Sequence, residues 1–306
     1  MKTSFLLFFL GVLVFLNVLV WQEIFDFVGN PYLEVIFFDV GQGDAIFIET
    51  PQKHQILIDG GPDSGILEKL GRVMPFWDKS IDLIILTHPE HDHFAGLIEV
   101  LKRYKVENIL WTGVVRDTAE YQEWLELINK EKAKIYIAKS GRRITTNPAL
   151  GVIEILYPLE NLEGQVFKNA NNSSVITQVT FRKNTFLNST EGKIQGSEGV
   201  KFLFTGDAYK SIERKLINQG INLDSDILKV GHHGSKTSTA EEFIKQVSPE
   251  IAVISAGKNN PYGHPHQETL DTLEKYGIDI LRTDKEGDIK IFSDGKNLTV
   301  KSKIKY

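Results

Sequence analysis

Seven of the eight histidines lie in three short clusters, and each cluster follows an apolar run with the length of a β-strand. The densest cluster is His88-Pro89-Glu90-His91-Asp92-His93, directly after Ile84-Ile85-Leu86, with five possible metal ligands in six residues. Imidazole nitrogen and carboxylate oxygen together suit zinc, manganese or iron. Such groups are costly to bring together without a cation, so their density favours a metal site over a solvated polar loop.

Two later positions have the same relation to an apolar run. Asp207 follows residues 202–206, where an aspartate can be a metal ligand, a turn residue or a helix cap. His232 and His233 follow residues 228–230 and lie between glycines, which permit a close approach of the backbone. Because loops just beyond buried strands hold side chains rigidly, we expect these groups to converge at one sheet edge.

The remaining pattern predicts the elements that position these groups. Strands are indicated by apolar, β-branched and aromatic runs, at 33–38, 45–49, 55–58, 81–86, 108–111, 135–138, 151–157, 174–181, 200–204, 227–230 and 251–255. Helices are indicated by apolar spacing, at 65–73, 94–104, 118–132, 209–219, 239–247 and 267–276. The polar segment 184–199 is predicted to be an exposed hairpin loop. Strands in two halves, each with its helices, predict an α/β fold: a four-layer αββα sandwich.

The N-terminus predicts a separate segment. Residues 5–21 form an apolar run, preceded by Lys2 and followed by Glu23 and Asp26. The run approaches the length needed to span a bilayer, so an uncleaved membrane anchor is expected, with the remainder outside the cytoplasm. A cleaved signal peptide followed by secretion is the first alternative, and a buried core helix is the second. We therefore divide the chain into an anchor or signal at 1–24, a linker at 25–33 and one folded domain at 34–306.

Composition narrows the chemistry further. The chain has no cysteine, which excludes disulfides, thiolate ligands and a cysteine nucleophile. The net charge of −5 gives no overall attraction to nucleic acid, so a polyanionic substrate would need the metal or a local basic groove. Four basic residues lie close to the motif loops and are candidates for phosphate binding, although a solvated surface role is equally consistent: Lys229, Lys236, Lys258 and Arg282.

Taken in order, the polar clusters resemble the metallo-β-lactamase superfamily signature, which is H-x-H-x-D-H, then a bridging Asp and a final His. More narrowly, the soluble hydrolase domain of ComEC-type DNA-uptake proteins is similar over about residues 34–292. The segments that carry this resemblance are 38–45, 57–61, 171–175, 229–235, 262–265 and 282–284.

The resemblance implies a role for each matching ligand. His88 and Glu90 would bind a first metal, and Asp92 and His93 a second. Asp207 would bridge the two metals, and His232 would complete the second site. One or two divalent ions, zinc or manganese, are expected.

Other residues are expected to assist. Asp92 would orient the attacking water, and His264 is our candidate donor to a developing oxyanion. Asp59 would orient the His-rich loop from behind, or serve only as a turn residue. Further residues expected to support the ligands are Asp39, Asn172 and His233.

The sequence departs from the superfamily pattern at two points. Glu90 stands where most members have His and where the ComEC-type domains have Asp. No histidine occurs between His93 and His232, so the usual middle ligand is missing and the first metal is expected to be loosely held.

The expected function is metal-dependent phosphodiester hydrolysis, with DNA as substrate and a separate channel protein as a partner, the oligomeric state being open. The alternatives are hydrolysis of a lactone, thioester or β-lactam on the same fold, and a non-catalytic binding module.

Overall fold

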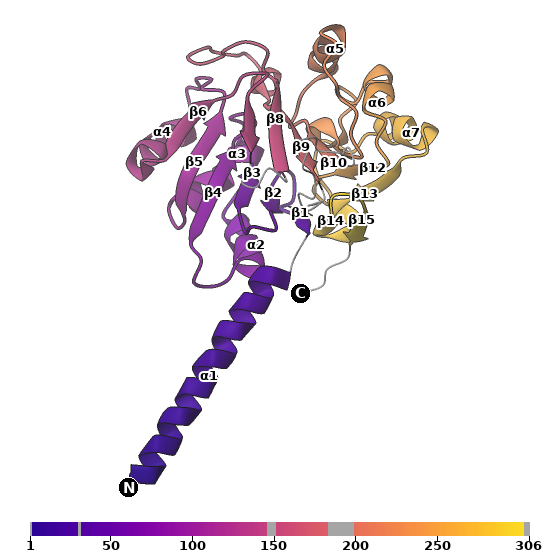
Figure 1. Ribbon diagram of the computed structural model, residues 1–306. Helices are drawn as coiled ribbons and strands as arrows, with labels where there is room; N and C mark the ends of the chain where they lie inside the picture. Colours follow the sequence, from indigo (N-terminus) through magenta and orange to yellow (C-terminus); the bar gives the residue numbers. More distant parts are fainter. Residues whose placement is uncertain (1, 30–31, 146–150, 183–198, 303–306) are drawn as a thin grey trace, which may run out of the picture.

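Two β-sheets lie face to face in the computed structural model, with helices on their outer faces (Figure 1). The structure describes residues 2–29, 32–145, 151–182 and 199–302. The predicted αββα sandwich is therefore confirmed. The predicted hairpin loop at 184–199 lies almost wholly outside the described residues.

The first sheet has the order β15-β14-β1-β2-β3-β4-β5-β6, and the second has the order β13-β12-β11-β10-β9-β8-β7. The strands of the first sheet are β1 (Leu33–Phe37), β2 (Ile46–Glu49), β3 (Gln55–Ile58), β4 (Ser80–Ile85), β5 (Lys105–Trp111), β6 (Lys134–Ile137), β14 (Ile289–Ser293) and β15 (Leu298–Lys301). Those of the second are β7 (Arg143–Thr145), β8 (Gly151–Tyr157), β9 (Ile176–Phe181), β10 (Val200–Phe204), β11 (Ile227–Lys229), β12 (Ile251–Ile254) and β13 (Asp279–Arg282).

Helices follow the strands in both halves of the chain. The α-helices are α1 (Lys2–Gly29), α2 (Gly65–Val73), α3 (His91–Leu101), α4 (Ala119–Glu131), α5 (Lys210–Asn218), α6 (Glu241–Val247), α7 (Gln267–Lys275) and α8 (Thr283–Glu286). Two short 3₁₀ helices are η1 (Ala170–Ser173) and η2 (Gly231–Gly234).

The alternation of side chains along each strand builds three apolar layers. In β1, Val35 and Phe37 point into the layer between the sheets, whereas Ile36 points outward. The outward side of the first sheet packs against α2, α3 and α4, with Phe94 and Trp124 fully buried there. The outward side of the second sheet packs in the same way against α5, α6 and α7. Burial on both faces explains why these strands read as continuous apolar runs.

Parallel pairing brings the predicted ligand loops to one edge. Strands β3 to β6 are parallel in the first sheet, and β10 to β13 are parallel in the second. The segments that follow β4, β10, β11 and β12 carry the His-rich cluster, Asp207, the pair at 232–233 and His264. Because the carboxyl ends of parallel strands meet at the same edge, these four segments come together.

Helix α1 extends away from the sandwich (Figure 1). It begins at Lys2 within the predicted segment 1–24 and continues to Gly29, into the predicted linker. Within the described residues, no helix combines the length and apolar content that crossing a membrane requires, so the expected transmembrane helix is not found there. The extracytoplasmic location stays a prediction.

Candidate metal centre

The His-rich cluster is held between β4 and the first turn of α3. His91, Asp92 and His93 begin the helix, and the backbone carbonyl of Glu90 accepts from the N–H of His93 at 2.9 Å. The loop between β1 and β2 lies directly against this turn, since the N–H of Asp44 donates to the carbonyl of Asp92 at 3.2 Å. Gly43 is required at this contact, because a Cβ there would collide with the Asp92 carbonyl oxygen.

Two overlapping groups of side chains form a buried ligand cluster. His88, His93 and Asp207 make one group, and His93 with Asp92 and His233 makes the other, with the ligand atoms of each group all within 4.8 Å of one another. His93 Nε2 lies 3.3 Å from Asp207 Oδ1. His233 Nε2 lies 3.2 Å from Asp92 Oδ2 and 3.5 Å from Asp207 Oδ2.

The unpartnered atoms of the cluster fit a divalent cation. Nε2 of His88, His93 and His233 and Oδ1 of Asp207 are buried and have no hydrogen-bond partner among the described residues. A buried polar atom without a partner is destabilising, and native structures rarely contain several together. Three imidazole nitrogens and carboxylate oxygens directed at one place are ligands that zinc and manganese accept.

Asp59 lies behind the cluster and contacts the segment before His88 as well as His93. It is fully buried, and its Oδ1 accepts from the backbone N–H of Thr87 at 2.8 Å. Its Oδ2 lies 2.6 Å from the Thr87 hydroxyl and 2.8 Å from His93 Nδ1. The carboxylate therefore accepts a hydrogen bond from the Nδ1–H of His93. This arrangement leaves Nε2 of His93 free for a metal.

The structure places His233, and not His232, deepest in the cluster. His233 is buried, while His232 Nε2 lies 3.7 Å from Asp207 Oδ2 and 3.4 Å from the Asn171 amide. His232 also contacts the Thr237 hydroxyl at 3.1 Å and belongs to none of the ligand groups among the described residues. The geometry thus favours His233 as the metal ligand and His232 as the supporting residue, which reverses the roles expected from the sequence.

Glu90 is also outside these ligand groups, within the described part of the chain. Its Oε1 pairs with the guanidinium of Arg116 at 3.0 Å, and its side chain is one-third exposed. This pairing competes with metal ligation, because the guanidinium already compensates the carboxylate charge. Glu90 nevertheless lines the cavity over the cluster.

The other expected supporting residues, Asp39 and Asn172, are not among the described residues that line the cavity over the cluster. Asp39 accepts from the N–H of Gly41 at 3.2 Å and so shapes the glycine turn of the β1–β2 loop. The Asn172 carbonyl accepts from the Tyr157 hydroxyl at 3.1 Å, while its neighbour Asn171 lines the cavity.

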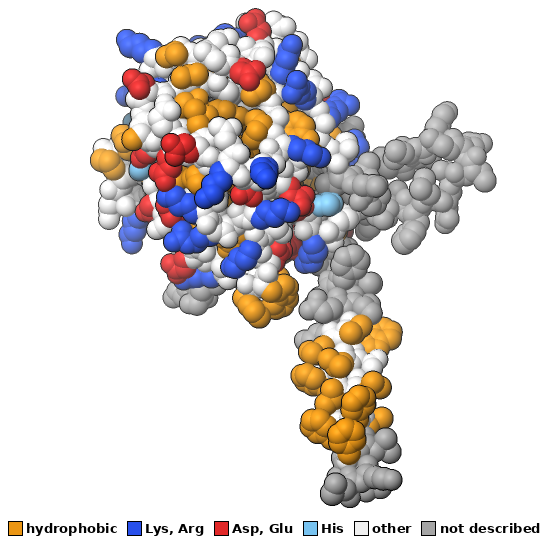
Figure 2. Space-filling view, turned by 90° about the vertical axis from the view of Figure 1, so that its left-hand side faces the viewer, with side chains coloured by type: hydrophobic (Ala, Val, Ile, Leu, Met, Phe, Trp, Pro, Cys, Tyr) orange, Lys and Arg blue, Asp and Glu red, His pale blue; other side chains and the backbone are white. Residues whose placement is uncertain are grey.

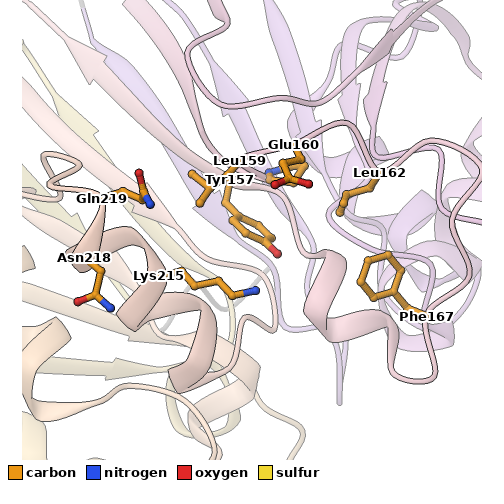
Figure 3. Close-up of a pocket in the computed structure, with 9 residues that line it drawn as sticks. Tyr157, Leu159, Glu160, Leu162, Phe167, Lys215, Asn218 and Gln219 are labelled. Atoms are coloured by element: carbon orange, nitrogen blue, oxygen red, sulfur yellow. The ribbon is translucent and has the colours of Figure 1, made fainter.

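The cavity over the cluster has a volume of about 160 Å³ and is lined mainly by polar side chains: Gln42, Glu90, Asp92, Asn171, Asp207, His232, His233, Tyr262 and His264. A larger pocket of about 440 Å³ is lined by the end of β8, the segment that follows it and α5 (Figure 3). Tyr157, Phe167 and Lys215 line this second pocket. No member of the ligand cluster is among its lining residues.

Two residues of the site were not assigned to it from the sequence. Asp44 is buried beside His233, and Lys229, for which phosphate binding and a solvated surface role were both open, is fully buried and pairs with Asp44 at 2.6 Å. The phosphate prediction for Lys229 is therefore wrong, because its ammonium faces a carboxylate and not solvent. Arg282 is similarly paired, with Asp284 at 2.7 Å.

Burial and mutual charge set the protonation of the cluster. Burial, assisted by the charge of His93, lowers the pKa of His88 to about 3, so this imidazole is neutral. Burial alone would lower the pKa of His93, but the carboxylates of Asp207, Asp59 and Asp92 raise it well above the ordinary value. In the same way Asp207, Asp44 and Asp92 overcome burial and raise the pKa of His233 to about 9.

Metal affinity should therefore rise with pH. At neutral pH the proton on Nε2 of His233 occupies the position of a metal bond, and binding must release it. Affinity for Mn²⁺ is expected to increase by about tenfold per pH unit for each released proton between pH 6 and 9. Calorimetric Mn²⁺ titrations across this range test the slope, and a flat profile would contradict these protonation states.

The chain is similar in sequence to a known protein family and to several curated proteins. Residues 38–163 match the family model described as the metallo-β-lactamase superfamily. ComE operon protein 3 of Bacillus subtilis (strain 168) is 34% identical over 275 residues, which are 84% of this chain and 32% of that protein. Competence protein ComA of Neisseria gonorrhoeae is 29% identical over 259 residues, 83% of this chain and 31% of that protein. The chain thus spans about a third of the length of these relatives.

Among solved structures, the metallo-β-lactamase fold protein YhfI from Bacillus subtilis has a TM-score of 0.48 and 13% identity, covering 81% of this chain and 96% of its own. The family match begins directly after β1 and includes the whole His-rich cluster. The predicted resemblance to ComEC-type proteins is confirmed by the two competence-related homologues. The chain therefore contains a metallo-β-lactamase superfamily domain, with homologues among the ComEC-type competence proteins.

Proposed function

We propose that this protein hydrolyses phosphodiester bonds of DNA with the help of one or two divalent ions. The observation that carries the proposal is the set of buried, unpartnered nitrogen and oxygen atoms of His88, His93, His233 and Asp207. Homology to competence proteins supports DNA as the substrate. Zinc and manganese both suit this balance of nitrogen and oxygen ligands.

The proposed ligands are the five residues of the two groups, with His93 shared between them: His88, Asp92, His93, Asp207 and His233. When bound, the cations would lower the pKa of water toward neutral and polarise the scissile phosphoryl group. Asp92 is the ligand side chain with the most access to the cavity, since its carboxylate is 30% exposed. It is therefore the group that we assign to orient the attacking water.

His264 is the proposed hydrogen-bond donor to the substrate. Burial, together with the charges of His233 and His232, lowers its pKa to about 4, so the imidazole is neutral at pH 7. The amide nitrogen of Gln42 lies 3.4 Å from its Nδ1, and a donor there fixes the tautomer with hydrogen on Nε2. The Nε2–H can then donate to an oxygen that gains negative charge.

Tyr262 offers a surface for a nucleobase at the rim of the cavity. Its side chain is 64% exposed, and its ring stacks on His264 with centroids 5.7 Å apart. Stacking of one base on an aromatic side chain contributes about 1–3 kcal/mol. Tyr262→Ala should therefore raise KM for single-stranded DNA by at least about fivefold. Tyr262→Phe keeps the ring and should match the wild type, and equal KM values for all three proteins would contradict stacking.

Electrostatic attraction of DNA would come from single basic side chains near the cavity, not from the charge of the whole surface. Figure 2 shows basic and acidic side chains next to one another on one face of the sandwich, without a continuous patch of one sign. Near the cavity, Lys236 and Lys258 are exposed and remain candidates for phosphate contact. A separate channel protein as a partner stays a prediction.

The function is tested by incubating the purified chain with single- and double-stranded DNA in the presence of Mn²⁺ or Zn²⁺. We expect metal-dependent cleavage that EDTA abolishes. Turnover of a lactone, a thioester or a phosphate monoester without any cleavage of DNA would sink the proposal. Absence of turnover in a chain that binds metal would point to a binding module instead.

A further inference from the structure

A buried ion pair joins the two sheets behind the ligand cluster. Lys229 is the last residue of β11 in the second sheet, and Asp44 lies in the β1–β2 loop of the first. Lys229 Nζ and Asp44 Oδ2 are 2.6 Å apart, and neither side chain is more than 2% exposed. Lys229 Nζ also donates to the Val230 carbonyl at 2.9 Å. A lysine is almost never fully buried unless a partner compensates its charge.

The second oxygen of Asp44 faces His233. Asp44 Oδ1 lies 3.4 Å from His233 Nδ1, beside the Ser255 carbonyl, which is 3.0 Å from the same nitrogen. The Ser255 carbonyl accepts a hydrogen bond from Nδ1, and the negative charge of Asp44 beside it also favours a proton on this nitrogen. This arrangement directs Nε2 of His233 toward Asp92 and Asp207, and it parallels the way in which Asp59 orients His93.

The ion pair also limits what Asp44 can bind. The Asp44 carboxylate lies within 4.8 Å of the ligand atoms of Asp207 and His233, so it is close enough to turn toward a metal. Lys229 engages Oδ2 of this carboxylate at 2.6 Å, so one of its two oxygens is committed to the ion pair. It also supplies a positive charge that offsets the repulsion between Asp44 and the other buried carboxylates.

We propose that Lys229 and Asp44 are positioning residues of the metal centre: the pair fixes Asp44 as an anion behind His233, which keeps Nε2 of His233 free for the metal. The inference rests on the metal site of the proposed function. It predicts that either residue controls metal affinity without contacting the metal. Loss of such an outer hydrogen bond typically costs about 10–100-fold in affinity.

The test measures Mn²⁺ affinity of the full chain by electron paramagnetic resonance of free Mn²⁺. Lys229→Met and Asp44→Asn should each weaken binding by about 10–100-fold. Removing one partner of a buried pair destabilises the fold, so Lys229→Met/Asp44→Asn, which removes both charges, keeps the test decisive. The control is Lys290→Met, because Lys290 of β14 pairs with Glu34 of β1 at 3.0 Å, neither residue belongs to the ligand groups, and the variant should keep wild-type affinity.

A second readout separates positioning from a merely structural role. In the metal-free protein with His233 neutral, ¹⁵N NMR should show a larger share of the tautomer with the proton on Nδ1 in the wild type than in the double variant. Wild-type affinity and an unchanged His233 tautomer in the double variant would overturn the inference. A wild type that binds Mn²⁺ but leaves DNA intact would refute the proposed nuclease function alone, whereas a wild type that binds no Mn²⁺ would refute both.

Discussion

His93→Ala should abolish tight binding of divalent metal and reduce hydrolysis by more than about a hundredfold, beyond the effect of losing a residue behind a ligand. His93 belongs to both ligand groups and is completely buried. Its Nε2 lies 3.3 Å from Asp207 Oδ1, and its Nδ1 is held by Asp59 at 2.8 Å. Metal content by atomic emission and initial rates of hydrolysis measure the two effects.

The matched control comes from the same turn of α3. The His91 side chain is 60% exposed and pairs with Glu120 at 2.8 Å, away from the ligand cluster. His91→Ala should keep wild-type metal content and rate. Full activity of His93→Ala, or an equal loss in both variants, would contradict the assignment of the centre.

Folding of the His93 variant must be measured separately. Without the imidazole, Asp59 and Asp207 lose a positive partner, and breaking a buried pair costs about 3–5 kcal/mol. Urea unfolding monitored by circular dichroism shows whether the folded state survives at the assay temperature. A folded variant that lacks metal assigns the loss of activity to the ligand.

The fold and the location of the centre could be predicted because both depend on local patterns. Apolar runs buried on both faces are distinct in sequence, and the polar residues that follow them mark one sheet edge. The His-rich cluster at 88–93 lies where its position after β4 predicts.

The choice between His232 and His233 could not be predicted, because it depends on a backbone conformation. Both residues adopt left-handed φ angles, 49° and 54°, within η2. This tight turn directs His233 inward and leaves His232 at the cavity wall. The flanking glycines permit the turn but do not indicate which imidazole points inward.

Long-range pairs account for the other differences. Glu90 is compensated by Arg116, which lies after β5, and Lys229 is compensated by Asp44 in the opposite sheet. No residue close to Glu90 in the sequence indicates that Arg116 is its partner. Lys229 carried a usable signal, since a lysine inside a strand that is buried on both faces requires a buried anion.

Asp59→Asn should weaken metal binding by about 10–100-fold, because one carboxylate organises two ligands. Asp59 fixes His93 directly, and it fixes His88 through the Thr87 hydroxyl, which lies 3.0 Å from His88 Nδ1. An asparagine oxygen can still accept from the Thr87 N–H. Its NH₂ group would then face His93 Nδ1 and donate to it, which forces the proton of His93 onto Nε2, where the metal should bind.

The readout is the dependence of the hydrolysis rate on Mn²⁺ concentration. The control is Asp82→Asn, because Asp82 accepts from the Gln55 N–H at 2.7 Å at a partly exposed position of β4. We expect the Asp82 variant to follow the wild-type curve and the Asp59 variant to require about 10–100-fold more metal. Excess metal should restore only part of the Asp59 rate, since the misplaced proton must be displaced for each ion that binds. Identical curves for the two variants would mean that Asp59 stabilises only the turn before Gly60, the role that its place in the sequence also allowed.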